Sequence, residues 1–435
     1  MKNLVLLFFC SLVFSLISAQ TQQVSIVEND QGIHLSVDGK AIILNGVNWD
    51  YYPIGTNYEF SLWAQSDDFI KEALEGEMSI LKEMGINVLR IYTGIQPRWI
   101  TYIYETYGVY TMLNHSFGRY GLSIDGEWVA NTDYSNSGAQ KVLLTEVTAL
   151  AQEYKNTPGL LFYLLGNENN YGLFWEGAET EDIPEDDPEA AARARAMYQL
   201  FNKATKAMKD IDTAHPVAMC NGDLQFLNII AEECQDVDIF GSNVYRGISF
   251  GDFFERVKTK LGKPIVFTEF GADGYNAIKK EEDQSAQAYY NLGNWQEIYE
   301  NAAGMGKVGN SLGGFTFQSS DGWWKFGQTK NLNLHDDNAS WANAGYAHDF
   351  VKGKDNMNEE WFGICAKGPT NAKGLYQLYP RAAYYAQKEA HAFDPFADGN
   401  NAKSLAAHFK GISLKKAAKK AKSDRKALLK AQDQK

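Results

Sequence analysis

The stretch that most constrains the fold is a run of six apolar or aromatic residues, Leu160–Leu165, followed by Gly166, Asn167 and Glu168. The run is too short to span a membrane, and Pro158-Gly159 and Gly166 mark its ends, as is typical of a strand buried on both faces. Barrels of the α/β class carry reactive side chains where such strands end, because the strand fixes the backbone while the next loop stays open. The pattern therefore predicts a barrel strand that presents Glu168 at its carboxyl end.

Similar apolar runs recur along the chain, separated by segments that mostly have helical spacing. We expect strands near residues 42–49, 86–92, 109–113, 160–165, 216–221, 237–243, 264–271 and 313–318. Helical patterns occupy residues 67–84, 140–154, 188–211, 284–303 and 380–392. Eight strand-like runs with helical connections predict an α/β fold, a single (β/α)8 TIM barrel with elaborated βα loops, including a long loop at 116–136.

The same pattern divides the chain into four segments. Residues 1–19 have the order of a secretory signal peptide, with Lys2 near the start, an apolar run and then Ser18-Ala19. Residues 20–41 alternate and turn as an N-terminal β-hairpin packed on one end of the barrel. Residues 42–395 form the barrel, and residues 396–435 form a basic C-terminal tail. The signal peptide predicts a secreted or periplasmic protein, and we expect no transmembrane segment.

Charge is distributed unevenly between the body and the tail. The chain carries a net charge of −13, of which residues 401–435 contribute +9, leaving −22 for the rest. An acidic body binds nucleic acid poorly, because phosphate neutralisation needs a basic face. Apolar residues among the lysines of the tail hint at an amphipathic helix that meets an anionic polymer or a membrane surface. A mobile solubilising extension is the simpler expectation.

Neither the cysteines nor the acidic residues predict a metal site. Beyond the signal peptide the chain has Cys220, Cys234 and Cys365, which are too few for a disulfide framework and lack the close spacing of a zinc site. The acidic run at residues 176–189 offers carboxylates that suit calcium, but its spacing fits no EF-hand loop, so a solvated loop is the simpler interpretation. We expect no cofactor and no metal, with calcium at 176–189 left open.

A second glutamate repeats the arrangement of Glu168. Glu269 follows the apolar residues Pro264–Thr268 and precedes Gly271. Strands four and seven of a barrel end at the same mouth, so two glutamates there can face one another across a bound sugar. Cleavage of a glycosidic bond needs one carboxyl that protonates the leaving oxygen and another that attacks the anomeric carbon or activates water.

Several motifs carry a resemblance to a known group of enzymes. Residues 165–168 (Leu-Gly-Asn-Glu) with 268–271 (Thr-Glu-Phe-Gly) resemble the catalytic pair of clan A retaining glycoside hydrolases, especially the barrel of glycoside hydrolase family 2. Residues 43–48 and 85–90 are similar to the first two strands of that barrel and of the β-1,3-glucanosyltransferases. Residues 360–364 and 380–385 resemble its closing segment.

The resemblance implies roles for five residues. Glu168 is the expected general acid/base and Glu269 the expected nucleophile. Asn167 is expected to contact the sugar 2-hydroxyl, a bond that can strengthen in the transition state. Tyr245 is expected to hold the nucleophile, and Arg90 is expected to keep it ionised. Three of them also have a purely structural interpretation: an acid at the start of a helix for Glu168, an ion pair for Arg90 and a core tyrosine for Tyr245.

Aromatic residues near the predicted mouth suggest sugar subsites, because the C–H faces of sugars stack on indole and phenol rings. The resemblance favours Trp323 or Trp324 as the platform beside the scissile bond, and Trp49 follows the first strand. His115, at the predicted end of the third strand, is either a substrate contact or a packing residue.

These observations predict a secreted retaining β-glycoside hydrolase that acts on a polysaccharide or oligosaccharide by double displacement. By resemblance, the leading expectation is an endo-β-1,3-glucanase or β-1,3-glucan transglycosylase with a β-glucan substrate. An exo-acting β-glycosidase, a β-mannanase or a β-galactanase remains open. Two further alternatives are a non-catalytic carbohydrate-binding barrel and a metal-dependent barrel hydrolase, although no His-rich ligand set supports the latter.

Overall fold

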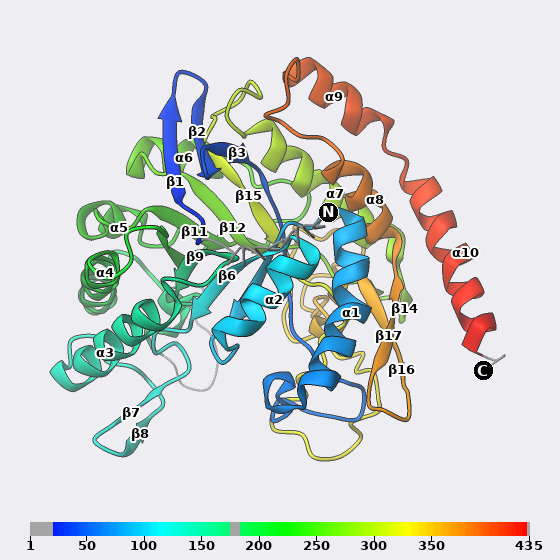
Figure 1. The fold of residues 1–435 in the computed structure, drawn as a ribbon, viewed down its shortest axis with the longest axis horizontal. Helices are drawn as coiled ribbons and strands as arrows, with labels where there is room; N and C mark the ends of the chain where they lie inside the picture. Colours follow the sequence, from blue (N-terminus) through cyan, green and yellow to red (C-terminus); the bar gives the residue numbers. More distant parts are fainter. Residues whose placement is uncertain (1–20, 175–182, 433–435) are drawn as a thin grey trace, which may run out of the picture.

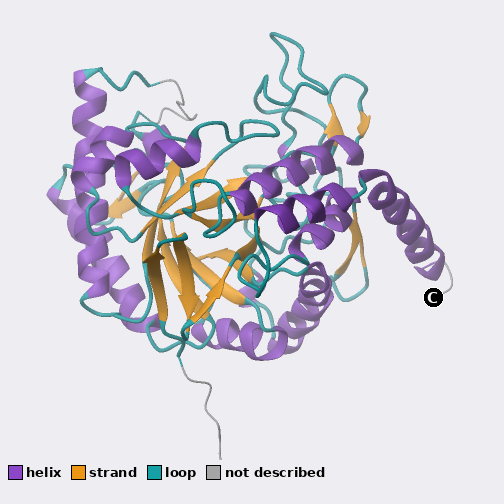
Figure 2. Ribbon diagram, turned by 90° about the horizontal axis from the view of Figure 1, so that it is seen from above, coloured by secondary structure: helices purple, strands orange, loops and turns teal. Residues whose placement is uncertain are grey.

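In the computed structural model, eight parallel strands close into one barrel that a ring of helices surrounds (Figures 1 and 2). The structure describes residues 21–174 and 183–432. The expected signal peptide, and residues 176–182 of the acidic run, lie outside the described residues. The predicted (β/α)8 barrel is confirmed.

The strands follow one another around the barrel in chain order, so each pairs with its neighbours in sequence and the last pairs with the first. They are β4 (Leu44–Asn48), β5 (Val88–Tyr92), β6 (Tyr110–His115), β9 (Leu160–Leu165), β10 (Val217–Gly222), β11 (Ile239–Asn243), β12 (Ile265–Phe270) and β15 (Ser311–Thr316). All eight overlap the runs expected from the sequence.

The surrounding helices are α1 (Asp67–Met84), α2 (Pro97–Tyr107), α3 (Ser137–Tyr154), α4 (Pro188–Lys209), α5 (Leu227–Glu233), α6 (Phe253–Leu261), α7 (Gln284–Glu300) and α8 (Ala382–His391). Helix α1 shows how sequence sets such an element. The Ser66 hydroxyl accepts the Phe69 N–H at the start, and Gly85 ends the helix at φ 89°, a left-handed conformation suited to glycine. Its apolar stripe faces the barrel.

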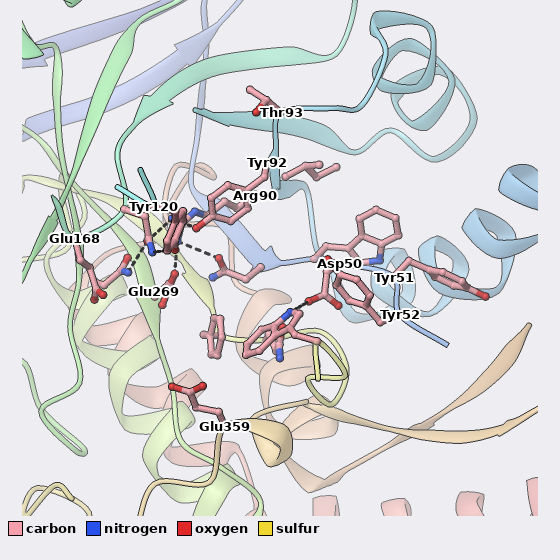
Figure 3. A pocket seen from close by; sticks show the side chains of 18 of the residues that line it. Asp50, Tyr51, Tyr52, Arg90, Tyr92, Thr93, Tyr120, Glu168, Glu269 and Glu359 are labelled. Atoms are coloured by element: carbon pink, nitrogen blue, oxygen red, sulfur yellow. Dashed lines mark hydrogen bonds and ion pairs between the residues drawn. The ribbon is translucent and has the colours of Figure 1, made fainter. Parts of the chain in front are cut away.

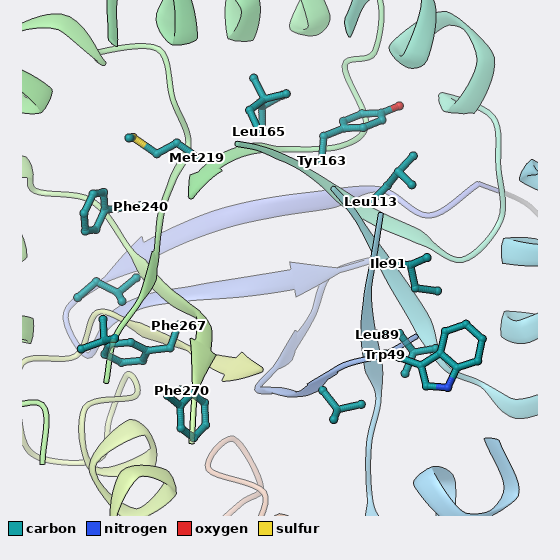
Figure 4. Packing of buried hydrophobic residues seen from close by; sticks show 14 of the residues in the cluster. Trp49, Leu89, Ile91, Leu113, Tyr163, Leu165, Met219, Phe240, Phe267 and Phe270 are labelled. Carbon is teal, nitrogen blue, oxygen red and sulfur yellow. The ribbon is translucent and has the colours of Figure 1, made fainter. Parts of the chain in front are cut away.

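Side chains alternate along each strand between the helices and the barrel axis. Leu89, Ile91 and Leu113 point outward into the core between strands and helices (Figure 4). Val88 and Met112 belong instead to a separate apolar cluster inside the barrel. Towards the carboxyl ends the inward positions become polar, because Arg90 follows Val88 and Asn114 follows Met112 two residues later. The interior of the barrel is therefore apolar below the carboxyl ends of the strands and polar at those ends.

The N-terminal segment covers the amino end of the barrel. Strands β1 (Val24–Asn29) and β2 (Gly32–Val37) form the expected hairpin, and β3 (Lys40–Ile42) adds a third antiparallel strand. Val24, Leu35 and Val37 belong to the same buried cluster as the inward residues of the barrel. The sheet therefore closes the end opposite the polar mouth.

The C-terminal segment corrects one expectation. Residues 396–432 are not a mobile extension, since they contain α9 (Ala402–Gly411) and α10 (Leu414–Gln432), which lie along the outside of the barrel (Figure 1). Leu405 and Phe409 are buried, and the Tyr385 hydroxyl of α8 donates to Asp424 over 2.7 Å. The apolar spacing noted in the sequence is what attaches these helices.

Smaller elements elaborate the loops. The long loop after β6 contains the hairpin of β7 (Leu122–Ile124) and β8 (Glu127–Val129). The segment after β15 contains β16 (Cys365–Thr370) and β17 (Tyr376–Pro380), and β13 (Tyr275–Asn276) pairs with β14 (Glu281–Glu282). Short 3-10 helices are η1 (Leu62–Ala64), η2 (Asn169–Gly172) and η3 (Glu359–Trp361). None of the helices described is both long and apolar enough to cross a membrane.

Candidate active site

A cleft of about 730 Å³ opens at the carboxyl ends of the barrel strands. Side chains from the ends of β4, β5, β9, β11, β12 and β15 and from the loops after them line it. Glu168, Glu269 and Arg90 lie in this cleft, as predicted (Figure 3). Asn167 and Tyr245 line it as well. Residues from separate parts of the chain therefore meet at one mouth.

Glu168 is held in an unusual backbone conformation. It follows β9 and has φ 54°, the left-handed region that non-glycine residues seldom adopt. Its N–H donates to the Cys220 carbonyl over 3.2 Å, and the neighbouring Asn167 N–H donates to the Asn169 side chain over 2.7 Å. Such conformations persist where surrounding contacts enforce them, and they concentrate at functional sites.

Glu269, in β12, receives a donor on each carboxylate oxygen. Arg90 Nη1 donates to Oε1 over 2.6 Å, and the Tyr245 hydroxyl donates to Oε2 over 3.0 Å. The Arg90 side chain is buried, so water screens this ion pair less than it would at the surface. Both contacts stabilise the ionised form of Glu269, the form required of a nucleophile.

Arg90 is itself fixed by hydrogen-bond acceptors on three other strands. Its guanidinium donates to Asn114 Oδ1 over 2.8 Å, to Asn48 Oδ1 over 3.2 Å and to the Thr268 carbonyl over 3.2 Å. It also donates to Asn167 Oδ1 over 2.8 Å. The planar fork of arginine suits this arrangement, because several donors keep fixed directions.

Asn167 precedes Glu168 in the chain and is connected to Glu269 through Arg90. Its Oδ1 accepts from Arg90 and, over 3.0 Å, from Asn243. Acceptance of those bonds fixes the amide orientation, so that Nδ2 points to the cleft, where it donates to the Tyr120 hydroxyl over 2.9 Å. The donor is thus oriented as the expected contact to a sugar hydroxyl requires.

Tyr245 is protected as a hydrogen-bond donor. Its ring packs edge-on against Trp341 and Phe362, with centroid separations of 5.5 and 5.8 Å. Burial, together with the nearby carboxylates of Glu269 and Glu168, raises the pKa of Tyr245 well above its ordinary value. The hydroxyl therefore stays protonated across the physiological pH range and donates a hydrogen bond to Glu269.

The two adjacent tryptophans occupy different places. Trp324 lines the cleft, and its Nε1 donates to Asp50 over 2.6 Å. Trp323 is only 2% exposed and turns away, with Nε1 donating to the Leu332 carbonyl over 2.8 Å. Trp324 is therefore the candidate platform, and the expectation for Trp323 is wrong because its ring packs in the interior.

His115 and Trp49 are less directly placed than expected. His115 lies outside the cleft lining, where Nδ1 accepts the Phe117 N–H over 3.1 Å and Nε2 lies 3.4 Å from Glu146. Of the two expectations for His115, the structure favours packing over a substrate contact. Trp49 lines one wall of the cleft but is mostly buried, and its Nε1 donates to Glu77 over 2.7 Å.

Several cleft residues carried no predicted role. Tyr92 ends β5, Tyr120 lies on the loop after β6, and Asp50, Trp341 and Glu359 come from other loops. Tyr92 was detectable as the next inward position after Arg90 on an alternating strand. The loop residues had no comparable signal, because loops lack the periodicity that orients side chains.

The described residues contain no group of three or more His, Cys, Asp or Glu side chains arranged to hold a metal ion. Cys220, Cys234 and Cys365 are buried free thiols. The possible calcium site at 176–189 falls mostly outside the described residues.

Together, the fold and the cleft define a (β/α)8 barrel with a glutamate pair at the carboxyl ends of its fourth and seventh strands. Residues 31–302 match the family model described as glycosyl hydrolases family 2, TIM barrel domain. Since the match spans more than half of the chain, the protein belongs to this family, and the resemblance noted in its motifs is confirmed. Among curated proteins, none is similar enough in sequence to count as a match.

Solved structures share the fold at low sequence identity. A β-glucuronidase of Bacteroides uniformis aligns with a TM-score of 0.54 and 15% identity, over 85% of this chain and 37% of that chain. A β-glucuronidase of Parabacteroides merdae gives 0.51 and 14%, over 85% and 39%. A β-galacturonidase of Eisenbergiella tayi bound to galacturonate gives 0.50 and 14%, over 85% and 54%. The alignments therefore span only about a third to a half of these longer chains.

Proposed function

We propose that the protein is a retaining β-glycoside hydrolase that acts by double displacement, with Glu269 as nucleophile and Glu168 as general acid/base. One observation carries the proposal. Both oxygens of Glu269 are bound by donors, Arg90 and Tyr245, while Glu168 lies in the same cleft outside those two contacts. A glycosidase of this type needs one ionised and one protonated carboxyl. Different surroundings give two carboxyl groups different pKa values.

The reaction proceeds in two displacement steps at the anomeric carbon. Glu269 attacks the anomeric carbon and forms a glycosyl ester, while Glu168 gives its proton to the departing glycosidic oxygen. Glu168, now ionised, then takes a proton from water or from a sugar hydroxyl, whose oxygen attacks the anomeric carbon and releases Glu269. Asn167 Nδ2 donates to the 2-hydroxyl of the reacting sugar, with the amide held by Arg90 and Asn243.

The charges in the cleft favour an uncharged sugar over a uronate. Among the described lining residues Arg90 is the only Lys or Arg, and Glu269 and Asn167 occupy its guanidinium. The acids of the lining are Asp50, Glu168, Asp223, Glu269 and Glu359. A uronate carboxylate placed there meets carboxylates and no available cation, which costs binding energy.

For the particular substrate we propose a β-1,3-linked glucan, cleaved internally or transferred to another sugar. The support is the similarity of the first two strands to β-1,3-glucanosyltransferases, together with the cleft aromatics. Secretion or export to the periplasm is proposed from the leader-like residues 1–19. A secreted enzyme of this kind meets polysaccharide outside the cytoplasm.

A glycan panel tests this function. Laminarin, β-mannan, β-galactan and the nitrophenyl β-glucoside, β-mannoside, β-galactoside and β-glucuronide are offered to the protein and to Glu269→Gln. We expect release of products from laminarin by the wild type, none from the glucuronide, and a loss of at least roughly a thousandfold in the variant. Cleavage of a nitrophenyl glycoside alone indicates an exo-acting β-glycosidase. Cleavage of β-mannan or β-galactan alone indicates an enzyme specific for that polysaccharide. Inactivity across the panel with laminarin binding retained contradicts catalysis and indicates a carbohydrate-binding barrel.

A further inference from the structure

Two tyrosines stand exposed in a cleft whose other aromatic residues are largely covered. Tyr92 is 39% exposed and Tyr120 is 54% exposed, although both line the cleft beside Arg90 and Glu269 (Figure 3). They come from neighbouring parts of the barrel, since Tyr92 ends β5 and Tyr120 follows β6, with which β5 pairs. Large exposed aromatic surface inside a concave site is a candidate for ligand contact.

The hydroxyl group of each tyrosine is tied to the polar network of the glutamate pair. Tyr120 accepts from Asn167 Nδ2 over 2.9 Å, and Tyr92 accepts from Arg90 Nη2 over 3.2 Å. These bonds attach the phenol oxygens to the polar network, while both residues line the cleft and stay partly exposed. The orientation of each ring is therefore set before any ligand arrives, which lowers the entropy cost of binding.

An arginine guanidinium lies over each ring. The Arg119 guanidinium carbon is 5.5 Å from the centroid of Tyr120, and that of Arg90 is 5.3 Å from the centroid of Tyr92. A cation over a phenol ring is attracted to the negative face of the ring and braces it from that side. Each tyrosine thus has an anchored hydroxyl, a braced face and a remaining surface open to the cleft.

We propose that Tyr92 and Tyr120 form a sugar-stacking subsite next to the glutamate pair, which receives a neutral pyranose unit through its C–H face. This inference rests on the proposed function. The ring surface supplies the contact with C–H groups, whereas the Tyr120 hydroxyl holds Asn167 until substrate arrives. Ring and hydroxyl therefore have separable effects, the first on binding and the second on orientation of the 2-hydroxyl contact.

Kinetics on laminarihexaose separate these effects. Tyr120→Ala and Tyr92→Ala each remove a stacking surface, so we expect KM to rise roughly tenfold. Tyr120→Phe keeps the ring and loses only the acceptor of Asn167, so KM is expected to stay within about twofold of wild type while kcat falls several-fold. Tyr289→Ala, which removes a 42% exposed tyrosine outside the cleft, is the matched control and leaves both constants unchanged.

A binding measurement tests the subsite without turnover. In native gels that contain laminarin, wild type and Tyr289→Ala are expected to be retarded equally, and Tyr120→Ala and Tyr92→Ala to be retarded less. Equal retardation of all four proteins, or an equal KM for Tyr120→Ala and Tyr120→Phe, overturns the subsite. Absence of turnover in the wild type with weakened retardation of the alanine variants contradicts the proposed hydrolysis and leaves the stacking subsite supported.

Discussion

At the scale of single residues, the two donors on Glu269 set the chemistry of the cleft. Arg90 supplies charge and Tyr245 supplies a neutral hydroxyl, so the two contacts stabilise the carboxylate in different ways. Asn114 and Asn48, which accept from Arg90, have no proposed part in the chemistry itself. They fix the direction of its guanidinium, and hence the position of the Glu269 oxygen that it binds.

Removal of the Tyr245 hydroxyl tests this account. For Tyr245→Phe we expect kcat on laminarihexaose to fall roughly tenfold with little change in KM, because one hydrogen bond to a charged group is lost. Initial rates over a substrate series measure both constants. Tyr107→Phe is the matched control, since it also deletes a tyrosine bond to a carboxylate, the 2.8 Å contact with Glu75, but away from the cleft. An unchanged kcat for Tyr245→Phe contradicts a role for this hydroxyl.

Most of the central site was predictable from sequence, and the errors have physical reasons. Glu168, Glu269, Arg90 and their partners lie on strand ends, where an apolar run announces the backbone position. His115 lies outside the cleft because strand side chains alternate, so that Asn114 points inward and His115 does not. Trp323 and Trp324 are adjacent in an irregular segment, and no period distinguishes the ring that faces the cleft.

Among the secondary-structure elements, helix α1 carries the buried acid Glu77 behind Trp49, which lines the cleft. Glu77 is 2% exposed and accepts from Trp49 Nε1. Burial raises its pKa from 4.5 to about 7, with Tyr376 and Lys367 opposing the increase. The unfolded chain therefore loses this proton at lower pH than the folded protein, and deprotonation favours unfolding.

The sign of this shift predicts how stability changes with pH. The contribution of Glu77 is complete below about pH 4.5 and is lost as pH rises through about 7. Relative to Glu77→Gln, the wild type should lose roughly 3 kcal/mol of unfolding free energy over this window. Urea denaturation at pH 5, 6, 7 and 8 measures the difference. Glu83→Gln, exposed on the same helix, controls for surface charge, and a constant wild-type-minus-Glu77→Gln difference across pH contradicts the assignment.

Some helices and strands were predictable from the sequence and others were not. The barrel strands and the longer helices α1, α3, α4 and α7 follow from apolar runs and helical spacing. The hairpin of β16 and β17 went unpredicted because Gly368 and Pro369 interrupt its first strand and weaken the alternation. The three-residue strands β7 and β8 are too short to carry a period.

At the scale of the whole molecule, the N-terminal sheet closes one end of the barrel and the C-terminal helices brace its side. Helix α10 is attached to the body by Asp424, which accepts from Tyr385, and by Arg425, which lies 3.1 Å from Glu282. Buried Leu405 and Phe409 attach α9. The positive tail therefore forms part of the folded unit.

Deletion of the tail is expected to destabilise the protein. A chain that ends at Asn400 loses the burial of Leu405 and Phe409, each worth about 1.5–3 kcal/mol, and exposes the α7 and α8 surfaces. We expect the thermal midpoint to fall by roughly 5 °C or more, and Phe409→Ala to give part of that fall. Differential scanning calorimetry measures both, with the exposed Lys410→Ala as control. An unchanged midpoint after deletion contradicts a structural role for these helices.

If Glu269 and Glu168 cleave a β-glycosidic bond by double displacement, the first product keeps the configuration of the anomeric carbon. Proton NMR during early hydrolysis of laminarihexaose reports the configuration before mutarotation. We expect the β-anomer to appear first, since two inversions at one carbon restore the configuration. Initial release of the α-anomer contradicts a covalent intermediate on Glu269.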